Sequence, residues 1–340
     1  MKKSLLALAV LGAFAASAQA QTSVTVYGSF DGGIRHQSNV ANNDSKTSMG
    51  SNGTYNSNRI GFKGVEDLGS GLNAHFDLET GFNTGTGALD NANGVLFNRA
   101  AFVGLGGAWG SLDLGRQYSA NFHTIGLYDP FNYKYTSIIP LAGQGGLTRL
   151  NNDVKYTGKF GGVGIEADYA LGEQTTGTSN GSTYGLGGHY SGGPFVVGAA
   201  YTNRKNVAGS ANEKNWTVGG AYSTGPFRVA LGYADAKYDA GFAAAGNAEL
   251  SQKDAWVGGS YALSPAAALS VAYYQTKYNA AADGKRKMFI LGATYALSKR
   301  TNFYADIDNR RYDGAAGAAL SSNGNNETQN GISVGINHLF

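Results

Sequence analysis

The sequence repeats one pattern in two nearby segments, HYSGGPFVVGAAYT (His189 to Thr202) and AYSTGPFRVALGYA (Ala221 to Ala234). Near its start, each segment has an aromatic residue followed by a short polar turn that contains proline. A second aromatic residue comes next, and large apolar residues then alternate with small or polar ones. In the second segment, Phe227, Val229 and Leu231 share one face of this alternation. Because a period of two is the spacing of a β-strand, we interpret each segment as part of a hairpin with one apolar face.

The same alternation recurs along the chain. It predicts sixteen strands, near residues 23–33, 58–66, 72–82, 98–106, 110–117, 151–157, 162–170, 183–190, 195–203, 213–222, 227–237, 252–261, 267–278, 287–295, 301–311 and 330–340. Short turns are expected at 67–71, 107–109, 158–161, 191–194, 223–226, 262–266 and 296–300. Longer connections alternate with these turns, and the first of them covers residues 34–57. An even number of antiparallel strands lets the sheet close with both ends of the chain on one side.

Three features favour a barrel in a membrane over a soluble β-sandwich. Aromatic residues stand at the ends of the apolar faces, beside the short turns, as Tyr190 and Phe195 do. Such residues suit the interface between lipid and water. The opposite faces are small or polar, which fits a water-filled interior, and long connections alternate with short ones. We therefore predict an all-β fold, a transmembrane antiparallel β-barrel of about sixteen strands.

The first twenty residues have the features of a secretory signal peptide. Lys2 and Lys3 precede an apolar run from Leu5 to Ala16, and Ala18-Gln19-Ala20 is a small-x-small cleavage site. This run is too short to cross a bilayer as a helix. We expect residues 1–20 to be removed and residues 21–340 to form the barrel of an outer-membrane protein.

The composition and motifs argue against an enzyme and against a nucleic-acid partner. The chain has no cysteine, and its five histidines show no metal-ligand spacing. The 26 basic residues include Lys2 and Lys3, so the remainder nearly balance the 23 acidic ones. A Gly-x-Gly-x-x-Ala match at Gly69 opens a strand rather than a helix, which leaves no helix N-terminus for phosphate. We expect no catalytic residues, no metal and no cofactor.

Several longer motifs resemble one family throughout the mature chain. They are VTVYG at 24–28, NRIGFKGVEDLG at 58–69, RAAFVGL at 99–105, GSLDLGRQ at 110–117 and HLF at 338–340. These segments resemble the Gram-negative general porins of Burkholderia, Bordetella, Comamonas and Neisseria. The resemblance implies a homotrimeric, sixteen-stranded channel for passive diffusion of ions and small hydrophilic solutes. It also implies surroundings of outer-membrane lipid and lipopolysaccharide.

The same resemblance implies that the third long loop, from Tyr118 to Leu150, folds into the barrel and narrows the pore. Arg59, Arg99 and Arg149 each lie where the chain returns from a long loop, so they should reach similar heights in the wall. The alternation points all three toward the lumen. We therefore predict an arginine ladder at the constriction and a weak preference for anions.

Other charged residues complete the predicted constriction. Asp129 is the acid of the third loop that would face the arginines, and Lys155 shares the phase of Arg149. Glu79 lies on the lumen face, as do Asp77 and Asp113, and these acids oppose the anion preference. The alternative interpretation is three arginines that are solvated separately at loop edges.

Two further classes of function remain open from the residues alone. The first is a solute-specific channel for a sugar or an anionic nutrient, and a sugar pore would need an aromatic ladder in the lumen. Residues of the third loop could supply it or could instead pack the loop against the wall, namely Tyr128, Phe131, Tyr133 and Tyr135. A barrel enzyme or an adhesin is the remaining, weaker alternative.

The ends of the barrel carry two predictions about assembly. Phe340 is the last residue, and it resembles the terminal signal read by the barrel-assembly machinery of the outer membrane. On the first strand, Gly28 and Gly32 lie on the apolar face beside Val26 and Phe30. Such small outward residues allow close approach of a neighbouring wall, in agreement with the trimer that the resemblance implies.

Overall fold

A computed structural model of the chain describes residues 23–41, 44–49, 53–91, 93–135, 148–242, 248–279, 283–314 and 328–340. The predicted signal peptide lies outside these residues. The first half of the wall contains β1 (Ser23–Ala41), β2 (Asp44–Met49), β3 (Arg59–Gly69), β4 (Leu72–Gly81), β5 (Ala100–Gly107), β6 (Gly110–Tyr118), β7 (Arg149–Phe160), β8 (Val163–Ala170) and β9 (Thr183–Gly192). The second half contains β10 (Phe195–Lys205), β11 (Asn212–Thr224), β12 (Phe227–Tyr238), β13 (Leu250–Ala262), β14 (Ala267–Asn279), β15 (Gly284–Ala296), β16 (Thr301–Asp313) and β17 (Thr328–Leu339).

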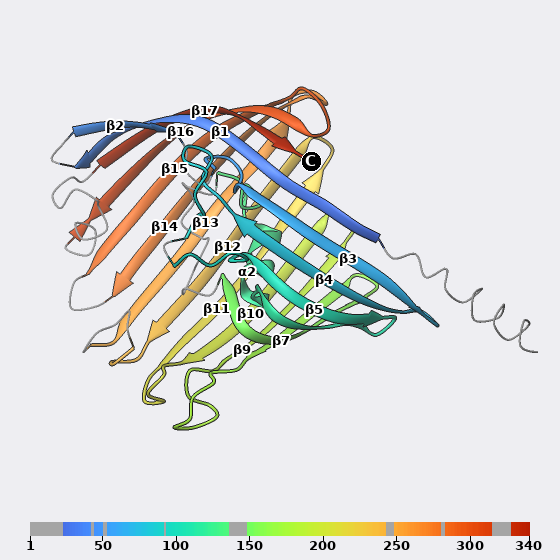
Figure 1. Cartoon of the computed structure of the whole chain (residues 1–340). Coiled ribbons are helices and arrows are strands. Elements are labelled where there is room, and N and C mark those ends of the chain that lie inside the picture. The colour runs from blue at the N-terminus through green and yellow to red at the C-terminus, as the bar shows by residue number, and fades with distance from the viewer. Residues whose placement is uncertain are drawn as a thin grey trace, which may run out of the picture.

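In the described part of the chain, sixteen antiparallel strands close into a barrel (Figure 1). From β3 to β17, each strand pairs with the next, and β1 joins the two ends of the series. The first half of β1 pairs with β3 and its second half with β17, so that Ser29 lies opposite both Arg59 and Leu339. The predicted fold and strand number are thereby confirmed, and each of the seven predicted short turns joins a pair of strands.

The first connection differs from its prediction. Residues 34–57 were expected to form a loop, but β1 continues to Ala41, and β2 folds back on it with Met49 opposite Ile34. Most residues of this extension are polar. A strand that rises above the lipid needs no apolar face, so hydrophobic alternation gives no signal for it. The prediction of a loop was therefore wrong for this segment.

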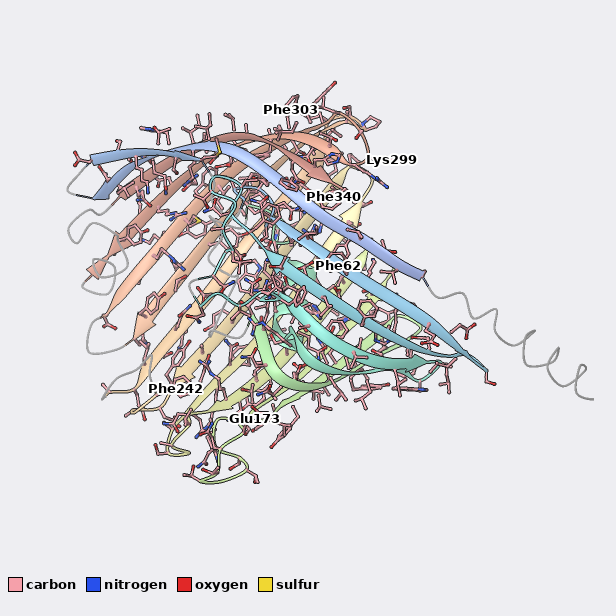
Figure 2. The ribbon with its side chains drawn as sticks, viewed as in Figure 1. Phe62, Glu173, Phe242, Lys299, Phe303 and Phe340 are labelled. Carbon is pink, nitrogen blue, oxygen red and sulfur yellow. The ribbon has the colours of Figure 1, made fainter. Side chains whose placement is uncertain are left out.

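Aromatic residues form a belt on the outer surface near the short turns. Phe195 lies opposite Tyr222 and Phe227 opposite Tyr261, with ring centroids 4.9 Å and 4.5 Å apart. All four side chains are exposed, as they must be to meet the membrane interface. Figure 2 shows side chains projecting from the outside of the wall, with Phe303 close to the turn that carries Lys299.

The carboxyl terminus closes the seam of the barrel on this outer surface. The backbone amide of Gly28 donates to the Phe340 carbonyl at 3.1 Å, and the Phe340 amide donates back to Gly28 at 3.3 Å. The Phe340 ring covers Gly28 and lies 6.1 Å from the ring of Phe30. A side chain at position 28 would overlap that ring. The Phe340 ring therefore fills the space beside Gly28, whereas Gly32 faces open space.

The third loop contains a helix that the sequence analysis did not predict, α2 (Ala120–Tyr128), and it lies inside the ring of strands (Figure 1). Glycines of the wall make room for it. A Cβ atom at Gly219 would overlap the Tyr128 ring, and one at Gly187 would lie 2.8 Å from the Thr124 hydroxyl. On this part of the wall, the small lumen-facing residues thus serve as a seat for the loop. No helix among the described residues is long and apolar enough to span a membrane.

After α2 the third loop crosses to the opposite wall and packs there. Tyr128, Phe131 and Tyr135 are buried in one apolar cluster with wall residues. The wall contributes Ala234, Trp256, Ala272, Tyr274, Met288, Ile290 and Tyr304. Two roles were open for the aromatic residues of the loop, a ladder in the lumen and packing against the wall. These three residues pack against the wall. The fourth, Tyr133, faces the cavity described below.

Candidate pore constriction

The helix α2 begins at an acid of the barrel wall. The side chain of Ser119 caps it by accepting a hydrogen bond from the Phe122 amide at 3.1 Å. The Asp168 carboxylate on β8 accepts from the Ala120 amide at 2.7 Å. A negative charge at a helix N-terminus is favourable because the first amide groups there point outward without partners. This contact attaches the start of the inward loop to the wall.

The end of α2 is held by an arginine from the facing strand. Arg228 on β12 donates to the carbonyl oxygens of Leu127, Asp129 and Pro130, at 3.0, 3.0 and 3.1 Å. A cation at a helix C-terminus satisfies the last carbonyl groups and opposes the helix dipole. The indole of Trp256 adds a hydrogen bond to the Tyr128 carbonyl at 3.0 Å. The wall thus fixes the helix at both ends.

Asp129 belongs to this attachment and not to the pore surface. Its side chain has no exposed area, and its carboxylate accepts hydrogen bonds from the Tyr274 hydroxyl and the Tyr133 amide, both at 2.7 Å. Burial raises the pKa of this carboxyl group above its usual range. The prediction that Asp129 faces the arginines across the pore was therefore wrong. Sequence position could not reveal that the carboxylate turns back toward β14.

A cavity of about 870 Å³ separates the third loop from the wall formed by β3 to β7. Its cationic lining residues are Arg59, Arg99, Arg116, Lys134 and Arg149, and its acids are Glu79 and Asp90. We call it the arginine cavity. The three predicted arginines and Glu79 thus lie around one space, together with two cations that the prediction did not include.

A chain of polar contacts links the three predicted arginines. Glu79 accepts from the Nε of Arg99 at 2.6 Å and lies 3.4 Å from the Nε of Arg59. The Tyr118 hydroxyl accepts from the Nη2 atoms of Arg99 and Arg149, each at 2.7 Å. The order of contacts is therefore Arg59, Glu79, Arg99, Tyr118, Arg149. Acceptors placed between guanidinium groups offset part of the repulsion between them.

A break in the strand alternation explains why Arg116 was missed. Strict alternation gives Arg116 the phase of Leu112 and Leu114, whose side chains are exposed on the outer surface. The register between β6 and β7 shifts between Gly115 and Gln117, which is a bulge. Arg116 lines the cavity, with its guanidinium on the Asn98 carbonyl and on the Asn151 side chain. The same bulge breaks the alternation from which the inward orientation of Arg149 was predicted. Arg149 nevertheless lines the cavity.

The third loop contributes a column of aromatic rings to the arginine cavity. Phe122 stacks on Tyr118 with centroids 4.8 Å apart and on Tyr133 with centroids 4.2 Å apart. At the end of the column, the Arg149 guanidinium lies 4.4 Å from the centre of the Tyr118 ring. Lys134, next to Tyr133, adds a cation on the loop side, and burial beside Arg59 lowers the pKa of its ammonium group to about 8.

The predicted residue Lys155 lies in a second, smaller cavity. This space of about 250 Å³ is lined by the acids Asp77, Glu79 and Asp113, with Lys155 and His123. We call it the acidic cavity. The Lys155 ammonium is 2.6 Å from Glu166 and donates to the Tyr118 carbonyl at 2.9 Å. Lys155 is therefore engaged with β8 and the third loop, and it does not line the arginine cavity.

The described residues contain no group of three or more histidine, cysteine or carboxylate side chains placed to hold a metal ion. Two of the histidines are paired with carboxylates instead. His75 contacts Asp113 at 2.6 Å, and His123 contacts Glu166 at 2.9 Å. Together with the arginine contacts, these pairs give a polar, charged passage beside the inward loop.

Comparison with known proteins agrees with this architecture. The Gram-negative porin family matches residues 7–315 of the chain. The outer membrane porin protein 32 of Delftia acidovorans is 34% identical over the full length of both chains, and an outer membrane porin protein of Bordetella pertussis is 44% identical over 38% of this chain and 37% of its own. The anion-selective porin from Comamonas acidovorans superposes with a TM-score of 0.80 at 26% identity, covering 94% of this chain and all of that one. With a closed sixteen-stranded barrel and full-length similarity of this kind, the chain belongs to the Gram-negative porin family, whose members are diffusion channels of the outer membrane and not enzymes.

Proposed function

We propose that the channel is weakly anion-selective and that the arginine cavity is where selection occurs. The observation that carries the proposal is the charge of its lining, which has five cationic side chains against two acids. Four of the cations are arginines, which remain ionised at any working pH. A narrow passage with walls of low dielectric constant concentrates the field of such groups on a passing ion.

The arrangement of the third loop also supports this proposal. The loop presents Phe122, Asn132, Tyr133 and Lys134 to the cavity, so no carboxylate of its described residues faces the arginines there. The Comamonas acidovorans porin, similar over 94% of the chain, is described as anion-selective. The acids of the neighbouring acidic cavity act in the opposite sense, which keeps the preference modest.

Reversal potentials across a potassium chloride gradient test the proposal. In planar bilayers, the unmodified protein should favour chloride over potassium by roughly a few-fold, and less so as salt screens the field. The triple variant Arg59→Ser, Arg99→Ser, Arg149→Ser should lose most of this preference. Arg286→Ser with Arg310→Ser is the control, because these arginines lie on β15 and β16 and do not line the arginine cavity. Cation preference in the unmodified protein, or equal potentials in the triple variant, would reject the proposal.

The channel proposed here is a homotrimer embedded in lipid and lipopolysaccharide. An apolar groove of about 620 Å³ on the outer surface supports the trimer, because it lies where β1, β16 and β17 meet. Gly32, Ile34, Phe303, Val334 and Ile336 are among its lining residues. Small and apolar groups of this kind allow close packing of transmembrane surfaces.

A further inference from the structure

The arginine cavity and the acidic cavity are neighbours along the pore. Glu79 and Tyr118 line both of them. On β4, Asp77 lies two residues from Glu79 in the direction of the short turn at residues 70–71, and both line the acidic cavity. A solute that moves past the arginines toward that turn therefore meets carboxylates next. The Nε atoms of Arg59 and Arg99 lie 3.4 and 2.6 Å from the Glu79 carboxylate, so these guanidinium groups are held at the level of the Glu79 side chain. From there to Asp77, the sign of the lining charge reverses over roughly 7 Å, the length of two strand residues.

Of the three carboxylates that line the acidic cavity, Glu79 is paired with Arg59 and Arg99, which leaves Asp77 and Asp113 to face a solute. Asp77 accepts from the Tyr27 hydroxyl at 2.7 Å, and Asp113 accepts from the Ser111 hydroxyl at 3.0 Å and contacts His75. Among the described residues, neither carboxylate forms an ion pair with a lysine or an arginine. A hydroxyl donor satisfies a carboxylate oxygen without neutralising it.

Among the described residues, neither of the two lysines that lie opposite these acids in the strand register forms an ion pair with them. Lys155 lines the acidic cavity, but its ammonium group is paired with Glu166 at 2.6 Å. Lys63 lies opposite Asp77 in the strand register, and its ammonium group is placed over the Tyr27 ring, 5.2 Å from the centroid. The acidic cavity therefore presents a net negative charge to a solute that carries an ammonium group.

We propose that the two cavities form one bipartite site for zwitterions of matching length, the class of ω-amino acids. The inference rests on the proposed function, because the carboxylate end binds at Arg59 and Arg99. The ammonium end binds at Asp77, and Asp113, two register positions farther from the arginines, adds negative charge on that side. A fitting solute separates its charges by roughly 7 Å, the span of two extended backbone residues. The probe 6-aminohexanoate has this length, whereas glycine places both charges too close to bridge the cavities.

The test measures block of the potassium chloride current through single channels by added solutes. We expect 6-aminohexanoate to reduce the current at a concentration at least three-fold lower than hexanoate, which lacks the ammonium group. Glycine should be weaker than 6-aminohexanoate by a similar factor. This comparison uses the unmodified protein, so it does not depend on the folding of any variant. Equal potency of 6-aminohexanoate and hexanoate would overturn the proposal.

Variants then locate the ammonium end. Asp77→Asn with Asp113→Asn keeps the shape of both side chains and should reduce the potency of 6-aminohexanoate to that of hexanoate. Asp235→Asn is the matched control, a buried acid on β12 outside both cavities, and should leave the potency unchanged. An unchanged potency in the double variant would also overturn the proposal.

The reversal potential separates this inference from the function on which it rests. A channel that prefers chloride but does not discriminate between 6-aminohexanoate and hexanoate contradicts the bipartite site alone. A channel without chloride preference contradicts the proposed function, and the site with it. In the double variant the chloride preference should increase, because two lumen carboxylates have been neutralised.

Discussion

The guanidinium of Arg149 lies over the ring of Tyr118, 4.4 Å from its centroid, and also donates to the hydroxyl of that ring at 2.7 Å. The same hydroxyl accepts from Arg99. A single tyrosine, the last residue of β6, therefore orders two arginine side chains of the wall. Because Tyr118 stacks on Phe122, the position of both arginines is coupled to the helix α2.

Tyr118→Phe should make the open channel noisier without abolishing its chloride preference. Phenylalanine keeps the aromatic column but removes the acceptor between Arg99 and Arg149, at a cost of about 1–3 kcal/mol for the lost hydrogen bonds. The charge of the cavity is unchanged, so the reversal potential should change little. Current noise within the open state is the measurement, with Tyr156→Phe as a control near the short turns. Equal noise in Tyr118→Phe and the unmodified protein would contradict this role.

Anion preference should fall as the pH rises through about 8. Burial, with Arg59 as the second cause, lowers the pKa of Lys134 to about 8, so its ammonium group is charged below that pH and neutral above it. The arginines stay charged throughout this range, so the change is confined to one of five cations. Reversal potentials at pH 6, 7, 8, 9 and 10 measure the step.

Lys134→Met supplies the control for the pH dependence. This variant should have the lower anion preference at every pH and show no step near pH 8. A step of the same size in Lys134→Met would assign the titration to another group.

The wall of the barrel was predictable because lipid imposes one rule on every strand. Each of the sixteen strands shows an apolar outer face, and the aromatic residues beside the turns fix where it ends. Segments that do not face lipid could not be predicted from this alternation. The extension of β1 beyond Gly33 and the strand β2 lie in the first connection, and α2 lies within the lumen. The wall positions that α2 packs against include glycines. The alternation shows that these residues are small, but it does not indicate that a helix packs on them.

The lining of the arginine cavity was predictable where a residue's height and phase follow from its strand. Arg59 and Arg99 line the cavity as their alternation indicates. Arg116 depends on a bulge at Gly115, and Arg228 depends on the path of the third loop. The orientation of the Asp129 carboxylate depends on partners far away in the sequence, above all Tyr274. Contacts between a loop and the opposite wall leave no periodic signal in the sequence.

Arg228→Met should loosen the third loop. The guanidinium donates to three carbonyl oxygens at the end of α2, and these would lose a charged donor while the apolar stem is retained. We expect a loss of about 2–3 kcal/mol in loop attachment, on the scale of hydrogen bonds to charged groups. The frequency of brief current closures should rise. Arg311→Met, on the exposed surface of β16, is the control. An unchanged closure frequency would show that the apolar cluster alone holds the loop.

Deletion of Phe340 should reduce the amount of barrel in the outer membrane while export across the inner membrane continues. The terminal residue pairs with Gly28 at the seam, so its loss weakens both the proposed assembly signal and the closure of the barrel. Fractionation into periplasm and outer membrane measures the outcome. Phe340→Tyr keeps the ring and should assemble. Normal surface levels of the deletion variant would contradict a role in assembly.

Gly32→Trp should dissociate the proposed homotrimer, whereas Gly188→Trp should not. A Cβ atom at Gly32 would meet nothing within 4 Å in the single barrel, so the isolated subunit offers open space where the tryptophan side chain begins. In a trimer built on the groove where β1, β16 and β17 meet, the same ring would collide with the neighbouring wall. Gly188 on β9 lies nearly opposite β1 in the ring of strands and faces lipid in that arrangement, with one backbone oxygen at 3.8 Å. Unheated migration in mild detergent distinguishes the species. A trimer that survives Gly32→Trp would show that the interface lies elsewhere on the barrel. A monomer from the unmodified protein would reject the homotrimer.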